Sequence, residues 1–362
     1  MLGISIYPEK QDYNQIIAYI DTAAKYGFKR VFSCLLSAKE SKEQLIQTFS
    51  SINDYIHSKN MIVILDVNPR VFDQFNASYN DLTFFKQLKA DGIRLDMGFD
   101  GKKEADMTFN EQDLIIEINI SNDNKYFDNI LSYHPKKSKL WASHNFYPQR
   151  YTGLSYEFFT KITAKFKQNY IKTAAFVTSN NASIGPWELN HGLCSMEICR
   201  DLDIVAQTKL LYATELIDDV IIGNSFANED ELKALSMIDS EYKSFRLTKE
   251  SLVNNTDLDN EILFLNHHFR RGDTNEYFIR STASRVKYKN YDFKPNNTPT
   301  KLYKGDVVIC NSNYAQYKGE LQIVLKDCDN VDLGKNLVAK IHPDEVMLLD
   351  LVKPLERFKF DK

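Results

Sequence analysis

Residues 61–69 read MIVILDVNP, an apolar run that ends in an aspartate and an asparagine. Seven further apolar runs lie in the first two thirds of the chain, with polar and charged residues gathered at their C-terminal ends. They are LGISIY (2–7), RVFSCLL (30–36), GIRLD (92–96), LIIEINIS (114–121), KLWASHNF (139–146), KTAAFVTS (172–179) and DVIIGNS (219–225). Eight short runs that alternate with amphipathic helical stretches predict a (β/α)₈ barrel of the TIM type, in the α/β class.

The C-terminal strand ends of such a barrel form one rim, where the active sites of barrel enzymes lie. The polar residues at these ends are therefore expected to meet in one pocket. They are Tyr7, Asp66, Asn68, Arg94, Asp96, Glu117, Asn119, His144, Asn145 and Asn224. The longest barrel insertion, about residues 180–194, opens on the same rim and is expected to form part of the substrate wall, because loops longer than about 12 residues are usually functional.

The chain of 362 residues is longer than one barrel of about 250 residues, so a second domain is expected. After about residue 240 the pattern changes to short β-like runs separated by glycine and asparagine turns. These include EILFLNHHF (261–269), EYFIRST (276–282), DVVICNSN (306–313) and VMLLDLV (346–352). We therefore predict a barrel over residues 1–240 and a smaller, mostly β domain over residues 241–362.

Composition and charge narrow the class of protein. The net charge of −4 and the pI near 6.0 argue against a nucleic-acid-binding or membrane-binding protein. The chain has no run of about 18 apolar residues and starts without a secretory signal. Its five cysteines are scattered without a CxxC pair, which favours reduced thiols over disulfides or a metal site. We expect a cytoplasmic protein.

Glu117 is the most informative single residue, because it lies in the middle of an apolar strand. Period-two alternation places Glu117, Asn119 and Ser121 on one face and the isoleucines between them on the other. A mid-strand glutamate belongs in a core only if it is paired or used in chemistry. Both alternatives are open here. Similarly, Arg94 could join Asp66 and Asp96 either in a pocket or in a buried ion-pair network that closes the barrel.

Several carboxylates could serve glycoside hydrolysis, which needs one protonated acid and one base or nucleophile. The candidates are Asp66, Asp96, Glu117, Glu197, Asp201 and Asp203, and the sequence does not decide between them. The segment His144–Tyr147 offers polar groups for sugar hydroxyls and aromatic faces for stacking. In the second domain, Arg280 and Arg285 could clamp a phosphate, or could lie on a solvated β-ribbon.

These segments together resemble the 6-phospho-N-acetylmuramidase family of glycoside hydrolases, formerly a family of unknown function. The matching motifs extend over nearly the whole chain. They include LDVNP (65–69), GIRLDMGF (92–99), EINIS (117–121), HNFYPQRYTGLS (144–155), IRSTASR (279–285) and KGDVVICNSNYAQYKGELQI (304–323). The resemblance implies a cytoplasmic bacterial enzyme with a TIM-type barrel and a cyclophilin-like C-terminal domain. It also implies peptidoglycan recycling, by cleavage of MurNAc-6-phosphate–GlcNAc into MurNAc-6-phosphate and GlcNAc.

The resemblance also implies site residues. It carries Glu117 over as a catalytic carboxylate, with an acidic partner on the segment after the seventh strand, Glu197 or Asp203. The chain departs from the family there, because the usual Pro-Thr-Leu-Glu-x-His-Arg reads CSMEICR (194–200), and the Gly-Asp after the eighth strand is Gly223-Asn224. The expected substrate-binding residues are Asp66, Arg94, Asp96, Asn119, His144, Tyr147, Arg200, Asn224, Arg280 and Arg285.

We therefore predict hydrolysis of a 6-phosphosugar glycoside without a cofactor or a metal ion. The expected partner is a small-molecule phosphorylated amino-sugar disaccharide, with no nucleic acid and no membrane, and a homodimer is compatible with the sequence. Two other classes stay open. One is another barrel enzyme that acts on a phosphorylated sugar, although no strand ends in the Schiff-base lysine of an aldolase. The other is a non-catalytic sugar-phosphate-binding protein.

Overall fold

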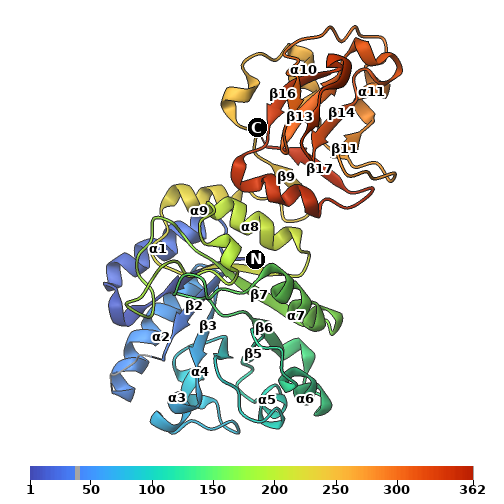
Figure 1. Cartoon of the computed structure of the whole chain (residues 1–362). Helices are drawn as coiled ribbons and strands as arrows, with labels where there is room; N and C mark the ends of the chain where they lie inside the picture. Colours follow the sequence, from blue (N-terminus) through green and yellow to red (C-terminus); the bar gives the residue numbers. More distant parts are fainter. Residues whose placement is uncertain (37–40, 362) are drawn as a thin grey trace. The chain divides into compact units, whose positions relative to one another are not determined.

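The computed structural model describes residues 1–36 and 41–361, in two units (Figure 1). The first unit is Met1–Ile238 and the second is Asp239–Lys362. The boundary expected after residue 240 lies beside this division.

The first unit is a closed barrel in which each strand pairs in parallel with the next and β8 pairs with β1. The eight apolar runs all form strands, which confirms the predicted TIM-type barrel. They are β1 (Leu2–Ile6), β2 (Arg30–Cys34), β3 (Ile62–Val67), β4 (Gly92–Leu95), β5 (Ile115–Asn119), β6 (Leu140–Ser143), β7 (Lys172–Val177) and β8 (Asp219–Ile222).

Helices connect the strands on the outside of the barrel (Figure 1). Their starts follow local capping chemistry: the Asp12 side chain accepts hydrogen bonds from the first turn of α1, and Ser41 forms a capping box with Gln44 at the start of α2. The helices are α1 (Tyr13–Lys25), α2 (Lys42–Ser58), α3 (Pro69–Gln74), α4 (Thr83–Gln87), α5 (Lys102–Met107), α6 (Tyr126–Ser132), α7 (Tyr156–Gln168), α8 (Ile204–Ala213) and α9 (Glu229–Ser236), with short 3₁₀ turns η1 (Pro8–Lys10), η2 (Lys137–Lys139) and η3 (Glu197–Cys199).

The second unit consists mostly of antiparallel sheet, as predicted. Its largest sheet has the order β11-β14-β13-β16, and a three-stranded sheet has the order β10-β17-β9. The strands are β9 (Lys243–Phe245), β10 (His268–Phe269), β11 (Phe278–Ser281), β12 (Lys301–Leu302), β13 (Asp306–Cys310), β14 (Leu321–Val324), β15 (Cys328–Asp329), β16 (Lys335–Lys340) and β17 (Arg357–Phe360). The helical segments are α10 (Asp257–Leu263), α11 (Ala283–Lys287), η4 (Lys249–Leu252), η5 (Ser312–Tyr317), η6 (Val331–Leu333) and η7 (Pro343–Leu351).

Two apolar runs that we expected to be strands contain helix, the first in its first three residues and the second over most of its length. Residues 261–263 belong to α10, which begins with a capping box between Thr256 and Asp259. Most of residues 346–352 belong to η7, which has Pro343 at its first position. Both elements begin with a helix-start signal just before the apolar run, and these signals outweighed the β-like composition.

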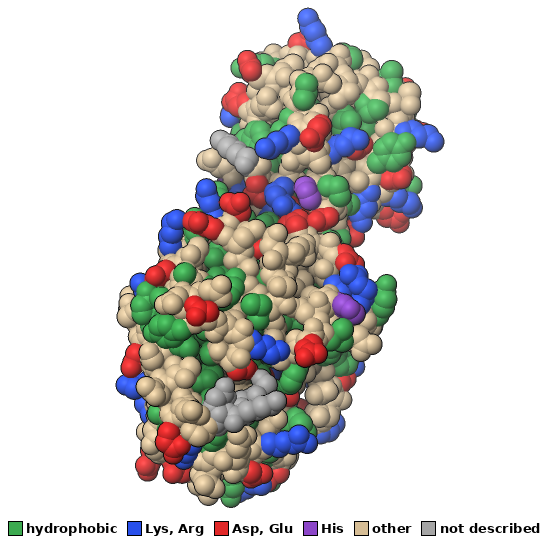
Figure 2. Space-filling model, turned by 90° about the vertical axis from the view of Figure 1, so that its left-hand side faces the viewer, with side chains coloured by type: hydrophobic (Ala, Val, Ile, Leu, Met, Phe, Trp, Pro, Cys, Tyr) green, Lys and Arg blue, Asp and Glu red, His purple; other side chains and the backbone are tan. Residues whose placement is uncertain are grey.

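Residues from β1, β2, β7 and β8 fill one side of the barrel interior with apolar side chains. Tyr7, Phe32, Cys34, Ala174, Phe176 and Ile221 form this cluster, and Phe146 and Ile184 pack against it. Among the described residues, no helix combines the length and the apolar character that a membrane crossing needs. On the face drawn in Figure 2, acidic and basic side chains lie interspersed.

Candidate active site

A pocket of about 180 Å³ lies where the barrel strands end. One part of its lining is polar and the other part is aromatic or aliphatic. The lining residues are Cys34, Leu36, Asp66, Arg94, Asp96, Asn145, Phe146, Phe176, Pro186 and Trp187. The expected convergence at the rim therefore brings together Asp66, Arg94, Asp96 and Asn145.

Arg94 is the centre of the polar part. It is 2% exposed, and its Nη1 donates to Asp66 Oδ1 at 2.6 Å and reaches Asp96 Oδ1 at 3.4 Å. Its Nε donates to Ser143 Oγ at 2.7 Å, and its Nη2 donates to Asn145 Oδ1. The guanidinium thus lies between the two carboxylates. The lining of the pocket therefore contains the ion-pair network that the sequence offered as one alternative, and a functional role of these residues stays a prediction.

Asp66 has an unusual proton affinity. Its side chain is 6% exposed, and burial raises its pKa from the usual value to about 6. The charge of Arg94 acts in the opposite direction, while the charges of Asp96 and Glu117 raise the pKa further. The Asp96 side chain is 34% exposed, so water can solvate its charge. Two neighbouring carboxyl groups with different environments are suited to one acid and one ionised carboxylate.

Glu117 does not line this pocket. Its side chain is fully buried, and its Oε1 accepts a hydrogen bond from Arg30 Nη2 at 2.7 Å. Arg30 Nη1 in turn donates to Asp219 at 3.0 Å. Arg30 and Asp219 are the first residues of β2 and β8, so the Glu117 carboxylate is directed toward the N-terminal end of the barrel, away from the rim. Its catalytic role stays a prediction, and its contacts are those of the structural alternative.

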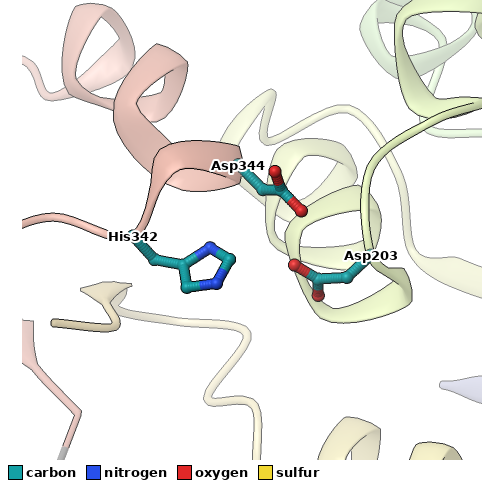
Figure 3. A group of neighbouring side chains, drawn as sticks. All are labelled: Asp203, His342 and Asp344. Atoms are coloured by element: carbon teal, nitrogen blue, oxygen red, sulfur yellow. The ribbon is translucent and has the colours of Figure 1, made fainter. Parts of the chain in front are cut away.

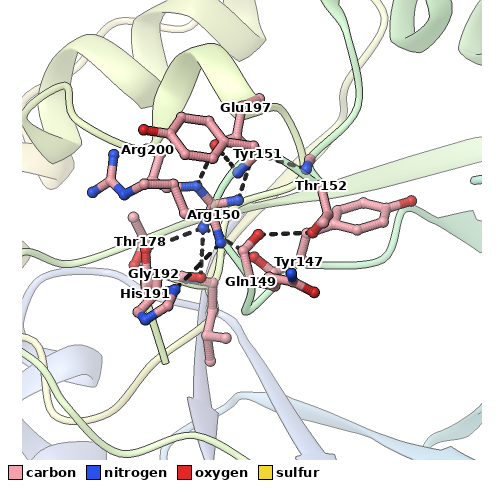
Figure 4. Close-up of polar contacts among 12 residues, drawn as sticks. Tyr147, Gln149, Arg150, Tyr151, Thr152, Thr178, His191, Gly192, Glu197 and Arg200 are labelled. Carbon is pink, nitrogen blue, oxygen red and sulfur yellow. Dashed lines mark hydrogen bonds and ion pairs between the residues drawn. The ribbon is translucent and has the colours of Figure 1, made fainter. Parts of the chain in front are cut away.

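Glu197 and Arg200 bind each other (Figure 4). Arg200 donates from Nε and Nη2 to the two carboxylate oxygens, each at 2.7 Å, and the backbone N–H groups of Tyr151 and Gly153 donate to the same carboxylate. Arg200 together with these N–H groups lowers the Glu197 pKa to about 2. Arg200 Nη1 also donates to the carbonyls of Tyr147, His191 and Gly192. The pair joins the loops that follow β6 and β7, and neither residue is among those that line the described pocket.

Asp203, the other predicted partner of Glu117, is the N-cap of α8 (Figure 3). Its carboxylate accepts hydrogen bonds from the backbone N–H groups of Val205 and Ala206. The structure does not bring Asp203 to the described pocket or to Glu117. His342 and Asp344, which Figure 3 also labels, belong to the second unit, where His342 is the N-cap of η7 and Asp344 lies in its first turn.

Two asparagines of the predicted set hold backbone at the rim. Asn119 Nδ2 donates to the carbonyl of Asp96 at 3.1 Å and so supports a pocket residue from behind. The Asn224 side chain accepts from the Ser179 N–H at 2.8 Å and donates to the carbonyls of Ser179 and Ala182. Asn224 therefore fixes the start of the long loop after β7, which is a positioning contact.

His144 and Tyr147 lie outside the pocket lining as well. The His144 ring stacks on Phe159 with a centroid distance of 4.2 Å, and its Nε2 is 2.8 Å from Thr163 Oγ1 on α7. Burial lowers its pKa to about 3, so the imidazole is neutral in the helix layer. Tyr147 is partly buried and its backbone N–H donates to Cys194, while burial raises the pKa of its phenol.

Arg280 and Arg285 lie together in the second unit. Arg280 Nε donates to Glu320 Oε1 at 2.7 Å, and Arg285 Nη1 is 3.5 Å from Glu320 Oε2. Glu320 is completely buried, and both guanidinium groups lie over the ring of Tyr317. The two arginines share the Glu320 carboxylate. Phosphate binding there stays a prediction.

In the apolar part of the pocket, sequence reasoning did not single out Cys34 and Phe176. Cys34 and Phe176 are at the C-terminal ends of β2 and β7, and Phe146 follows β6. The alternation that placed Asp66 would also have placed Cys34 and Phe176 on the inner face. Pro186 and Trp187 come from the long loop after β7 that we expected to form a wall. No periodicity could have selected these two residues from a loop.

Comparisons with known proteins are consistent with the resemblance in the sequence. The family model described as 6-phospho-N-acetylmuramidase, N-terminal, matches residues 2–237, and the model for the C-terminal part matches residues 245–361. An uncharacterized B. cereus protein of known structure is 45% identical with a TM-score of 0.90, over 100% of this chain and 99% of that one. A conserved Enterococcus faecalis protein with an unknown function is 22% identical with a TM-score of 0.73, over 100% and 96%. No curated protein matches the chain.

Proposed function

Because this chain belongs to the 6-phospho-N-acetylmuramidase family, we propose that it is a glycoside hydrolase that cleaves MurNAc-6-phosphate–GlcNAc. The products are MurNAc-6-phosphate and GlcNAc, and the reaction serves the recycling of cell-wall peptidoglycan. The family models support this assignment over both units of the chain.

The observation that carries the proposal is the pair of carboxylates on one arginine. Asp66 and Asp96 both reach Nη1 of Arg94 inside the rim pocket, at 2.6 and 3.4 Å. Glycoside hydrolysis needs two carboxyl groups with different proton affinities on either side of the scissile bond. Asp66, with a pKa of about 6, is the proton donor in this proposal, and the more exposed Asp96 is the nucleophile.

The proton and the bonds balance in two steps. Asp66 gives its proton to the glycosidic oxygen while the bond between that oxygen and the anomeric carbon breaks. The Asp96 carboxylate attacks the anomeric carbon and forms a glycosyl ester. A water molecule then gives a proton to Asp66 and hydrolyses the ester, which restores both groups.

The separation of the two groups favours this retaining sequence. Both carboxylate oxygens lie within 3.4 Å of one nitrogen atom of Arg94. The two contacted oxygens are therefore at most about 6 Å apart, which is below the ~6.5–9.5 Å separation of inverting enzymes. In this proposal Asp66 replaces Glu117 as the catalytic acid, because Glu117 is fully buried on Arg30.

Product analysis tests the function. The full-length protein is incubated with the disaccharide carrying the 6-phosphate and, separately, with the same disaccharide without it. We expect release of GlcNAc from the phosphorylated substrate, with a first-formed MurNAc-6-phosphate that keeps the anomeric configuration of the bond. Binding of the phosphorylated disaccharide without any release of GlcNAc would overturn the hydrolase proposal in favour of a sugar-phosphate-binding protein. Conversion to an isomeric disaccharide would favour another barrel enzyme.

A further inference from the structure

Trp187 is a large aromatic residue at the pocket that takes no part in the proposed proton transfers. It is 45% exposed and lines the pocket next to Pro186. Tryptophan side chains that stay half in water at a pocket wall present a flat apolar face to whatever enters. Sugar rings have an apolar C–H face together with hydroxyl groups at their edges. The lining combines this aromatic surface with the hydrogen-bonding groups of Asp96 and Asn145, which matches such a ring.

The segment that carries Trp187 is held at both ends. On one side, Ile184 and Ser225 exchange two backbone hydrogen bonds of 2.8 Å. On the other side, the His191 N–H donates to the carbonyl of Pro148 at 2.8 Å, and the His191 carbonyl accepts from Arg200 (Figure 4). The tip of the loop is thus anchored a few residues before and after the indole. A loop backbone held in this way loses little conformational freedom when a ligand binds.

Phe146 gives the pocket a second aromatic surface with a fixed orientation. Its ring packs edge-on against Phe176 at a centroid distance of 5.1 Å and against Phe32 at 6.1 Å. The aromatic side of the pocket therefore has a fixed shape, because packing against other aromatic side chains holds Phe146 in place.

The charges in the polar part of the pocket lining disfavour the binding of a phosphate group. Among the described residues that line the pocket, Arg94 is the one cation, and it faces the carboxylates of Asp66 and Asp96. Its Nε and both Nη atoms already donate to protein oxygens. A phosphate monoester carries about −1.5 to −2 charges near neutral pH, so it would meet repulsion here and no free donor of Arg94.

We propose that Trp187 stacks on the uncharged sugar of the substrate, the GlcNAc ring, and that the phosphorylated sugar directs its phosphate away from this lining. This inference rests on the proposed function for the identity of the two sugars. It makes Trp187 a specificity-determining residue for the leaving half of the disaccharide, a residue that neither donates nor accepts a proton in the reaction.

Tryptophan emission gives a direct test, because the chain has two tryptophans and the other one, Trp141, lies in β6 beside Lys172. The full-length wild type and W187F are titrated with GlcNAc, with MurNAc-6-phosphate and with inorganic phosphate. We expect GlcNAc to change the emission of the wild type and to leave that of W187F unchanged. The matched control is L189A, since Leu189 is also 45% exposed on the same loop and does not line the described pocket. It should respond like the wild type.

Turnover separates this inference from the proposed function. W187A should raise the KM for the phosphorylated disaccharide about ten-fold, the loss expected for one stacking contact, with a smaller change in kcat. L189A should keep both constants. A wild-type emission that responds to phosphate or MurNAc-6-phosphate but not to GlcNAc would overturn the inference, and so would normal KM in W187A. A protein whose Trp187 responds to GlcNAc but that cleaves neither disaccharide would keep the inference and refute the hydrolase.

Discussion

The guanidinium of Arg30 binds the carboxylate of Glu117, with 2.7 Å between Nη2 and Oε1, and both side chains are at most 1% exposed. Arg30 also donates to Asp219, so one arginine connects two acidic groups inside the barrel. Burial raises the Asp219 pKa, but the charges of Arg30, the N-terminal amine and Lys172 outweigh it and the pKa is lowered. Removing one partner of a buried ion pair is strongly destabilising, because it leaves a buried charge without that partner. We therefore infer that the ion pair of Arg30 and Glu117 stabilises the barrel.

The E117Q variant tests this assignment. We expect it to lose unfolding free energy, up to the about 3–5 kcal/mol of a broken buried pair, because Arg30 loses one of its two carboxylate partners and keeps only Asp219. Its turnover at a temperature where it is folded should stay near that of the wild type. Urea unfolding and steady-state kinetics measure the two effects. A stable E117Q protein with a collapsed kcat would restore Glu117 as the catalytic residue.

Removal of the Asp66 carboxylic acid should have the opposite effect to E117Q, with a loss of turnover and a smaller loss of stability. The D66N side chain keeps its shape but cannot give a proton, so we expect kcat to fall by about 10²–10⁴-fold. The thermal midpoint should change less than in E117Q. The exposed Asp73 on α3 provides a control, and D73N should be unchanged in both measurements. Near-normal turnover in D66N would contradict its role as the acid.

The pH dependence of turnover follows from the raised pKa of Asp66. Burial moves this pKa to about 6, and the acid must be protonated to act. Activity should therefore fall as the pH rises through about 6, and kcat/KM measured from pH 4 to 9 should show this limb. A flat profile between pH 5 and 8 would argue against Asp66 as the proton donor.

The pair of Glu197 and Arg200 should act on substrate binding through the loops it joins. In E197Q one carboxylate oxygen becomes an NH2 group, which cannot accept the hydrogen bonds that this oxygen receives from Arg200 and from one backbone N–H. We therefore expect the KM to rise several-fold and the thermal midpoint to drop, with kcat largely kept. Because the Glu197 pKa is held at about 2, chiefly by Arg200, the pair should not titrate between pH 4 and 9. If turnover in E197Q instead falls by about 10²–10⁴-fold, the range for a missing acid or base, Glu197 is catalytic.

Substitutions of Arg280 and Arg285 should have different effects, because the two arginines contact Glu320 at different distances. R280A removes the 2.7 Å partner of a completely buried carboxylate and should lower the stability of the second unit strongly. R285A removes only a 3.5 Å contact, so the fold should persist. If Arg285 binds phosphate as predicted, R285A should raise the KM for the phosphorylated disaccharide about ten-fold or more, the range for a lost charge-assisted hydrogen bond. An unchanged KM in R285A would remove Arg285 from the site.

Much of the architecture could be predicted from local patterns. All eight runs with polar C-terminal ends are strands. The buried part of a parallel strand has to be apolar, whereas its C-terminal end at the rim can carry polar residues. The errors in the second unit also have a local cause. In residues 261–263 and 346–351 the helix-start signals at Thr256 and Pro343 decided the outcome over composition.

The sequence by itself determined the barrel, the inward face of β5 and the rim position of Asp66, Arg94 and Asp96, since strand periodicity is a local property. Only the tertiary structure decided which acidic residue forms an ion pair with which arginine. Glu117 is 87 residues from Arg30, while Asp66 is 28 residues from Arg94, and both acids face the barrel interior. The closure of the barrel pairs Glu117 with a charge from the start of β2 and leaves Asp66 at the pocket. Burial and charge partners set the chemistry of a carboxylate, and both arise only when distant strands come together.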